Sequence, residues 1–253
     1  MTIWLRSALF ALGQTILILC FTLLLPLALL LPYRPRFRLL TQWNRATLWW
    51  LRITCGIQWR IHGLDHIPAG NAILLSNHQS TWETLLLPLL FAPQTWVLKR
   101  ELLRIPLFGW GLALARPIAI DRGAGRKAIR QLVEQGRQRL DDGIWVVIFP
   151  EGTRVAPGKR KPFAIGGALL AEQSGYPVIP IAHNAGHCWP RHSFRKYPGS
   201  IDLVVGPVID SHGRKASEIN RLAEEWITRT RIELGDLTPV QSTTNSGTME
   251  QNS

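Results

Sequence analysis

The chain has 253 residues, of which 46% are hydrophobic, which suits one α/β domain with a buried core and a membrane segment. Lys and Arg outnumber Asp and Glu by 29 to 17, and the net charge of +12 favours anionic partners such as nucleic acid, lipid headgroups or phosphorylated substrates. The three cysteines, Cys20, Cys55 and Cys188, are far apart without CxxC or zinc spacing, which excludes a disulfide framework and a cysteine metal site.

The N-terminus carries a long uncharged stretch from Ala8 to Leu31. A helix needs roughly 20 apolar residues to cross the hydrocarbon of a bilayer, and this stretch exceeds that length. No small-residue cleavage site follows it, so we expect a retained anchor rather than a signal peptide. Basic residues gather on its C-terminal side, which predicts that the bulk of the chain faces the cytoplasm at the cell inner membrane. They are Arg34, Arg36, Arg38 and Arg45, against Arg6 alone on the other side.

A second arrangement of the N-terminus is equally compatible with the sequence. Pro26 and Pro32 can bend or end a helix, and residues 37–57 mix apolar side chains with arginines in a pattern typical of an interfacial helix. The two segments could form a helical hairpin that enters one leaflet without crossing. Residues 1–57 are therefore predicted to be membrane-anchoring helices, with spanning and one-leaflet insertion both open.

The remainder of the chain alternates apolar strands with helices. Short apolar runs predict strands at 72–76, 95–99, 145–149, 178–182 and 201–205, and longer runs predict helices at 81–91, 125–142, 163–174 and 216–234. This order predicts an α/β domain over residues 58–236, with a mixed sheet flanked by helices. Residues 237–253 are polar and lack periodicity, so we expect a disordered tail.

A histidine and a carboxylate follow the first predicted strand of the domain. Residues 77–83 read Asn-His-Gln-Ser-Thr-Trp-Glu, which places His78 in a loop and Glu83 in the first turn of the next helix. Such a pair can remove a proton from an alcohol. The same spacing makes Ser80 and Glu83 a capping box, with Ser80 as the N-cap. Both interpretations remain open, because a carboxylate in a first helical turn can serve both purposes.

A candidate anion-binding turn follows the most apolar strand. Residues 149–154 read Phe-Pro-Glu-Gly-Thr-Arg, in which Gly152 allows a tight turn and Arg154 can form a fork on a phosphate. The alternative is an ordinary Pro-Glu-Gly turn. Lys99 and Arg122 also end apolar stretches and add cationic groups, although each alone would be read as solvated surface.

Other catalytic signatures are absent from the sequence. Four residues of metal-binding type lie close together: His183, His187, Cys188 and His192. Gly186 and Pro190 argue against a helix that would align them, and no His-Glu-x-x-His motif occurs, so we expect no metal site. The chain also lacks the Gly-x-Ser-x-Gly elbow and the glycine-rich nucleotide motifs, which disfavours serine esterases and nucleotide-binding folds.

Taken together, these motifs resemble the glycerolipid acyltransferase family, in particular the bacterial enzymes that acylate lysophosphatidate. The family motif Asn-His-x-x-x-x-Asp resembles residues 77–83, and Phe-Pro-Glu-Gly-Thr-Arg is intact at 149–154. A Gly-x-x-x-Ile-Asp-Arg theme preceded by a Lys is similar to Lys99 followed by residues 111–122, and an apolar strand with Pro is similar to 178–181. The resemblance covers roughly residues 60 to 210 with the motifs in the family's order.

The resemblance implies a mechanism without a cofactor, a metal or a covalent acyl-enzyme. His78 would be the general base for the glycerol sn-2 hydroxyl, Glu83 would orient it, and the alkoxide would attack a thioester of acyl-CoA or acyl carrier protein. The implied substrate-binding residues are Lys99, Arg122 and Arg154 on the phosphate, together with Glu151, Gly152 and Thr153 in the turn that shapes the pocket.

Glu83 stands where the family has Asp. Because of this extra methylene, the identities of the acyl donor and of the lipid acceptor stay open. Family members also acylate lyso-ornithine lipid and glycerol-3-phosphate. A non-catalytic membrane protein that binds anionic lipids is the competing class. We expect anionic membrane lipids as partners but no nucleic acid, because the basic residues are not interleaved with exposed aromatics in one tract.

Overall fold

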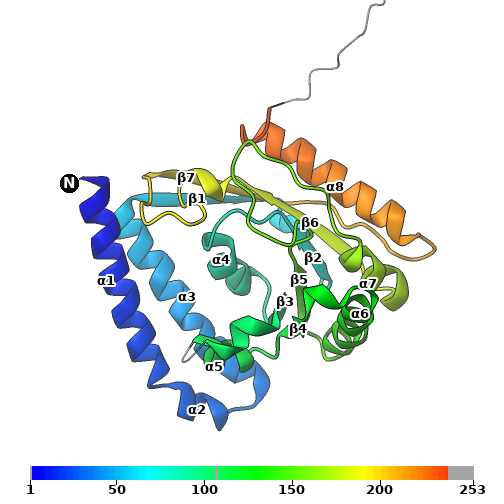
Figure 1. Cartoon of the computed structure of the whole chain (residues 1–253), viewed down its shortest axis with the longest axis horizontal. Coiled ribbons are helices and arrows are strands. Elements are labelled where there is room, and N and C mark those ends of the chain that lie inside the picture. The colour runs from blue at the N-terminus through cyan, green and yellow to red at the C-terminus, as the bar shows by residue number, and fades with distance from the viewer. Residues whose placement is uncertain (1, 106–107, 239–253) are drawn as a thin grey trace, which may run out of the picture.

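The computed structural model describes residues 2–105 and 108–238, apart from the side chains of Phe108 and Arg122 (Figure 1). Seven strands form one sheet in the order β1-β7-β6-β2-β5-β3-β4. Their bounds are β1 Ile57–His62, β2 Ile73–Ser76, β3 Gln94–Lys99, β4 Ile118–Ile120, β5 Trp145–Ile148, β6 Val178–His183 and β7 Gly199–Val205. Every residue of β2, β5 and β6 is buried, which explains why these three strands read as continuous apolar runs.

The sheet is mixed, as predicted. Strands β6, β2, β5, β3 and β4 pair in parallel, whereas β7 pairs antiparallel to β6 and parallel to β1. The carboxyl ends of the five parallel strands therefore lie along one edge of the sheet. The candidate site residues lie at this edge: Lys99 is the last residue of β3, Glu83 is in the helix α4 (Trp82–Leu90), and the others are in the segments that leave the strands. An open α/β sheet binds its ligands at this edge.

Helices cover both faces of the sheet. Successive residues of the central strands point to opposite faces, and both sets are apolar and buried. On one face Leu74, Val147 and Ile179 share a core with α4 (Trp82–Leu90) and α3 (Tyr33–Cys55). On the other face Ile73, Leu75 and Val146 share a core with three further helices. These are α6 Arg126–Asp141, α7 Gly166–Ser174 and α8 Ala216–Glu233.

The N-terminus forms a helical hairpin in which α1 (Ile3–Thr22) lies beside α3, with the short α2 (Leu25–Leu29) between them (Figure 1). The indole Nε1 of Trp50 on α3 donates to Leu9 O on α1 at 3.2 Å. A Cβ atom on Gly13 would lie only 2.0 Å from the same Nε1, so the close approach of the two helices requires glycine there. Asn44 Nδ2 donates to Leu85 O at 3.0 Å and joins α3 to α4.

Within the described residues, α1 is the only helix long and apolar enough to cross a membrane by length and composition. The uncharged stretch predicted from Ala8 to Leu31 is not one helix, because the chain turns at Leu23–Leu24, just before Pro26. Arg6, expected outside the apolar helix, lies inside α1, where its Nε donates to Thr54 O at 2.8 Å. The uncharged side chains therefore occupy α1, α2 and the turn that joins them.

The structure adds elements that the apolar pattern did not predict. Strands β1 and β4, the helix α5 (Phe108–Ala113) and four 3-10 turns were not predicted. The helix predicted to begin at Phe163 begins at Gly166, because Ala164 instead donates its N–H to Pro150 O at 2.9 Å. Most of the predicted tail, residues 239–253, lies outside the described residues. Its first two residues, Leu237 and Thr238, are described.

Candidate active site

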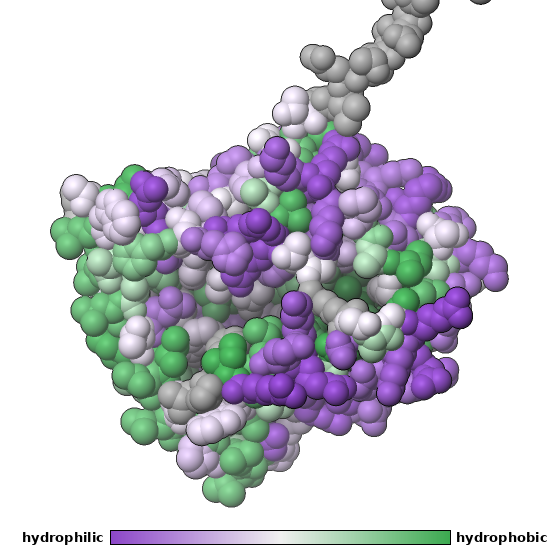
Figure 2. Space-filling view, in the orientation of Figure 1, coloured by the Kyte–Doolittle hydropathy of each residue, from purple (hydrophilic) through white to green (hydrophobic). Residues whose placement is uncertain are grey.

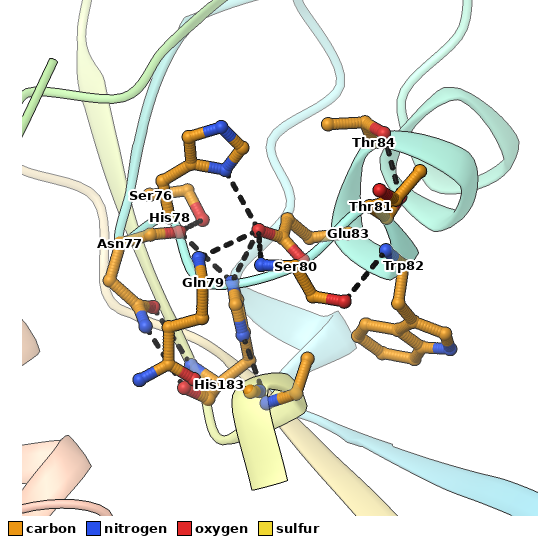
Figure 3. A network of polar contacts seen from close by, with 12 residues as sticks. Ser76, Asn77, His78, Gln79, Ser80, Thr81, Trp82, Glu83, Thr84 and His183 are labelled. Atoms are coloured by element: carbon orange, nitrogen blue, oxygen red, sulfur yellow. Dashed lines mark hydrogen bonds and ion pairs between the residues drawn. The ribbon is translucent and has the colours of Figure 1, made fainter. Parts of the chain in front are cut away.

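A histidine–carboxylate pair lies at the carboxyl end of the central strand β2. His78 is in the loop after the strand, Glu83 is in the first turn of α4, and Nδ1 of His78 is 2.8 Å from Oε1 of Glu83 (Figure 3). Because an ionised carboxylate only accepts hydrogen bonds, Nδ1 carries the proton and Nε2 holds the lone pair. Nε2 has no hydrogen-bond partner in the part of the chain that the structure describes, and the side chain is 16% exposed.

The same carboxylate oxygen also supports the loop. Oε1 of Glu83 accepts the backbone N–H groups of Gln79 at 2.9 Å and Ser80 at 2.8 Å. The prediction that Ser80 is the N-cap was wrong, since α4 begins at Trp82 with Thr81 in that position. Ser80 Oγ nevertheless accepts the N–H of Trp82 at 3.2 Å. Glu83 therefore holds the imidazole and the start of the helix with one oxygen.

A second histidine lies behind Glu83. His183, at the end of β6, is fully buried, with Nε2 2.9 Å from Asn77 O and 3.8 Å from Glu83 Oε1. Burial lowers the pKa of His183, which favours its neutral form. Burial by itself would raise the pKa of Glu83, but the two histidines and the Ser80 N–H lower it to about 2. Glu83 is therefore an anion at neutral pH.

The Phe149–Val155 turn fixes the backbone and one ring face of His78. The imidazole stacks on Phe149 with centroids 4.1 Å apart. Glu151 Oε2 accepts the backbone N–H of His78 at 2.8 Å, and His78 O accepts the N–H of Val155 at 2.7 Å. Glu151 is buried, and its carboxylate is directed at the backbone of His78. Burial raises its pKa to about 7, with the negative charges of Glu83 and Asp236 adding to the rise, although the His78 N–H and Arg231 oppose it.

The predicted cationic residues end neighbouring strands at this edge. Lys99 is the exposed last residue of β3, and its register partner is Ile120 at the end of β4. Arg122 lies two residues further on, but its side chain is outside the described part. Thr153 and the half-buried Arg154 follow β5, after Gly152, whose φ of 70° is the left-handed conformation that favours glycine. The topology thus brings these four positions to the edge where His78 lies.

An apolar cavity of about 360 Å³ lies next to the ring that stacks on His78. Its lining comes mainly from β3, β4, β5, α6 and the start of α7 and is mostly apolar. Lining residues include Phe149, Pro150, Ile129, Leu132, Ile148 and Gly166. A cavity of this character suits an alkyl chain better than a charged group.

Several residues around the base were not predicted from the sequence. Asn77 joins two strand ends, because its amide donates to His183 O at 3.0 Å and accepts the N–H of His183 at 3.0 Å. Arg231 and Asp236 reach Glu151 and Gln79 from the far end of the chain. One signal was available: Arg231 follows Ile219, Ala223 and Ile227 at intervals of four, on the buried stripe of α8. A charged residue in an apolar stripe marks a buried partner.

Comparisons with known proteins place the chain among acyltransferases. An acyltransferase family model matches residues 58–184. A 1-acyl-sn-glycerol-3-phosphate acyltransferase of Pseudomonas aeruginosa is 46% identical over 85% of this chain and 84% of that protein. A relative of the same name from Limnanthes douglasii is 34% identical over 62% of this chain and 56% of that protein.

The fold has also been seen in a crystal structure. The 1-acyl-sn-glycerophosphate (LPA) acyltransferase PlsC of Thermotoga maritima superposes with a TM-score of 0.77 over 91% of this chain and 95% of that one, at 23% identity. The family model, the Pseudomonas relative and the ordered motifs around His78 lead to one conclusion: the chain belongs to the acyltransferase family.

Proposed function

We propose that this protein transfers a fatty acyl group from a thioester, acyl-CoA or acyl carrier protein, to the sn-2 hydroxyl of lysophosphatidate, giving phosphatidate. The observation that carries the proposal is the 2.8 Å contact between His78 Nδ1 and Glu83 Oε1, which leaves Nε2 available beside the Phe149–Val155 turn. The Pseudomonas relative is a 1-acyl-sn-glycerol-3-phosphate acyltransferase, which supports the choice of acceptor.

In this mechanism, Nε2 of His78 accepts the proton of the sn-2 hydroxyl as the oxygen attacks the thioester carbonyl. Glu83 stabilises the imidazolium that forms, as a buried carboxylate does for the histidine of a hydrolase triad. The tetrahedral intermediate then expels the thiolate, which takes the proton back from Nε2. The acyl group moves directly between the two substrates, and general-base help of this kind contributes ~10²–10⁴-fold to the rate.

Binding of the acceptor rests on charge at the carboxyl edge of the sheet. Lys99, Arg122 and Arg154 bind the phosphate, and Gly152 and Thr153 shape the turn beside it. Arginine suits this task because its guanidinium makes bidentate hydrogen bonds to phosphate oxygens. The apolar cavity next to Phe149 takes an alkyl chain, which would bring an ester or thioester carbon close to the base.

The helical hairpin attaches the enzyme to one leaflet of the cell inner membrane from the cytoplasmic side. Its apolar side chains are exposed over α1 and α2, where hydrophobic residues gather at the left of the molecule (Figure 2). The hairpin contacts the catalytic domain at two places: Trp4 of α1 stacks on Phe194 at 5.5 Å, and Leu25, the first residue of α2, lies against Gly111. A hairpin held to the domain at both places supports in-plane insertion rather than a crossing.

The experiment is His78→Ala in the full chain, assayed in purified membranes with lysophosphatidate and an acyl thioester. We expect a loss of transfer of at least ~100-fold, since the general base is removed. His62→Ala is the matched control, because His62 lies at the end of β1 and its Nε2 contacts Asp202 at 3.1 Å. Retained transfer by His78→Ala would overturn the proposal. Wild-type turnover of lyso-ornithine lipid instead of lysophosphatidate would correct the acceptor alone.

A further inference from the structure

Two charged residues at the C-terminal end of the domain are buried against each other. Arg231, in the last turn of α8, is 3% exposed, and Asp236, just beyond the helix, is 2% exposed. Arg231 Nε donates to Asp236 Oδ2 at 2.6 Å, and Nη2 donates to Lys159 O at 3.1 Å. Other arginines of α8 pair along the helix surface, as Arg229 does with Glu233, so the inward direction of Arg231 is particular to it.

This pair touches the two residues that hold His78 on either side. Asp236 Oδ2 also accepts Nε2 of Gln79 at 2.7 Å, and Gln79 in turn gives its backbone N–H to Glu83. Arg231 Nη1 lies 3.5 Å from Oε1 of Glu151, whose other oxygen accepts the N–H of His78. The amide of Gln79 accepts the N–H of Gly186 at 3.0 Å, so its orientation is fixed.

A network of this kind is costly as a source of stability alone. Charged groups taken out of water lose hydration free energy, and their mutual attraction barely offsets this loss. Apolar residues of similar volume often stabilise a fold equally well. Three ionisable groups are buried here: Glu151, Arg231 and Asp236. They converge on the loop that carries the base, where a small displacement of a catalytic group lowers the reaction rate strongly.

We propose that Arg231 and Asp236 are positioning residues of the acyl-transfer site, which hold Gln79 and Glu151 so that the His78 loop keeps its imidazole on Glu83. This inference rests on the proposed function, in which His78 is the base. Neither residue touches substrate. The C-terminal helix thus takes part in the reaction through the loop between β2 and α4.

The charges around Glu151 make the proposal testable by pH. The groups that face Glu151 are the His78 N–H, Arg231, Glu83 and Asp236, and after burial these set its pKa of about 7. Arg231 lowers that pKa and Asp236 raises it. Loss of Arg231 should therefore move the ionisation of Glu151 to higher pH, and loss of the Asp236 charge should move it to lower pH.

The experiment compares kcat, KM and the pH profile of the full chain in membranes for wild type, Arg231→Met, Asp236→Asn and Arg231→Lys. We expect kcat to fall between ~10- and ~100-fold for Arg231→Met while KM stays within about 2-fold, because the base is displaced and the substrate contacts are not. Because ionised Glu151 is the stronger acceptor for the backbone N–H that holds the His78 loop, the acid limb of activity moves to higher pH in Arg231→Met and to lower pH in Asp236→Asn. Arg231→Lys keeps a cation and leaves the limb where wild type has it.

Arg229→Met is the control, since Arg229 lies two residues away on the exposed face of α8. In a Glu151→Gln background the carboxyl group that titrates is absent, so Arg231→Met should no longer shift the acid limb of the pH profile. If Arg231→Met fails to fold, the opposite shift in Asp236→Asn still decides the matter. Equal loss of activity at every pH in both variants would overturn the proposal. Retained transfer by His78→Ala would instead overturn the proposed function, whatever these variants do.

Discussion

Glu83 is the residue on which the most contacts of the site converge. Its Oε1 receives three N–H groups, from His78, Gln79 and Ser80, all within 2.9 Å. The family pattern has Asp here, and the sequence alone could not say whether the longer side chain preserves the pair. The geometry answers in part: with α4 beginning at Trp82, the extra methylene spans from the helix to the loop without loss of the His78 contact.

Glu83→Asp should therefore reduce activity, although it restores the family residue. The carboxylate would withdraw by about one ångström and could not satisfy all three donors, so we expect kcat to fall at least ~10-fold. Steady-state acyl transfer in membranes measures the effect, with Glu134→Asp on the exposed face of α6 as the control. Unchanged kcat in Glu83→Asp would show that the loop adjusts freely.

Glu151 should make the protein less stable as the pH rises. Its folded pKa of about 7 lies above the ordinary value of 4.5, so between these values the folded state binds more protons than the unfolded state. The free energy of unfolding then falls as the pH rises through this window, by about 3 kcal/mol from this group. The lowered pKa of Glu83 acts below pH 4.5 and does not oppose the trend.

Glu151→Gln removes that titration while keeping an oxygen that can accept the His78 N–H. We expect its melting temperature in detergent to exceed that of wild type increasingly from pH 5 to pH 8 and then to level off, since the ionised carboxylate is what costs wild type stability. Thermal unfolding followed by tryptophan fluorescence measures the difference at each pH. A constant difference across this range would mean that Glu151 does not titrate there.

Among the elements, those with strong apolar patterns were predicted well. Strands β2, β5 and β6 are buried on both faces, and their carboxyl ends bring His78, Glu151 and His183 together. Strands β1 and β4 were not predicted, for two different reasons. β1 alternates with exposed Gln58 and Arg60 at the sheet edge, and β4 is only three residues long. Its place is set by pairing with β3, which a local pattern does not contain.

The α1–α3 pairing depends on one small residue. A side chain at Gly13 would collide with the Trp50 indole, so Gly13→Leu should push the helices apart and cost about 1–3 kcal/mol of stability. Thermal inactivation of membrane-bound enzyme reports this cost. Gly70→Leu is the matched control, because an added Cβ there meets no atom within 4 Å. Equal inactivation of the two variants would argue against close packing of the hairpin.

At the scale of the whole molecule, the sequence predicted a mixed α/β fold with two site motifs but not the residues that lie behind them. The mixed α/β architecture followed from the alternation of apolar runs and was confirmed. The network of Arg231, Asp236 and Gln79 joins residues more than 150 positions apart, and no short motif encodes such a contact. Whether the apolar N-terminus forms one helix or a hairpin also depended on packing, since α1 lies along α3.

In the proposed function, the hairpin brings the protein to the lipid that it acylates. Leu12 and Leu19 of α1 are 60% and 54% exposed although both are large and apolar, which is unfavourable in water and favourable in a leaflet. Burial of an exposed Leu is worth about 1.5–3 kcal/mol, so replacing both with Lys should weaken vesicle binding by at least ~100-fold. Co-sedimentation with phosphatidylglycerol-containing vesicles measures the partition. Leu64→Lys is the control, because Leu64 is 50% exposed after β1, away from the hairpin.

The same double variant separates attachment from chemistry. Neither Leu12 nor Leu19 contributes a hydrogen bond at the His78 site, so transfer to lysophosphatidate dissolved in detergent micelles should stay near the wild-type rate. Transfer to lysophosphatidate presented in vesicles should fall with the partition, because the acceptor lies in the bilayer. Equal losses in micelles and vesicles would mean that α1 supports the fold of the site itself, and unchanged vesicle binding would mean that the exposed face of α1 does not meet lipid.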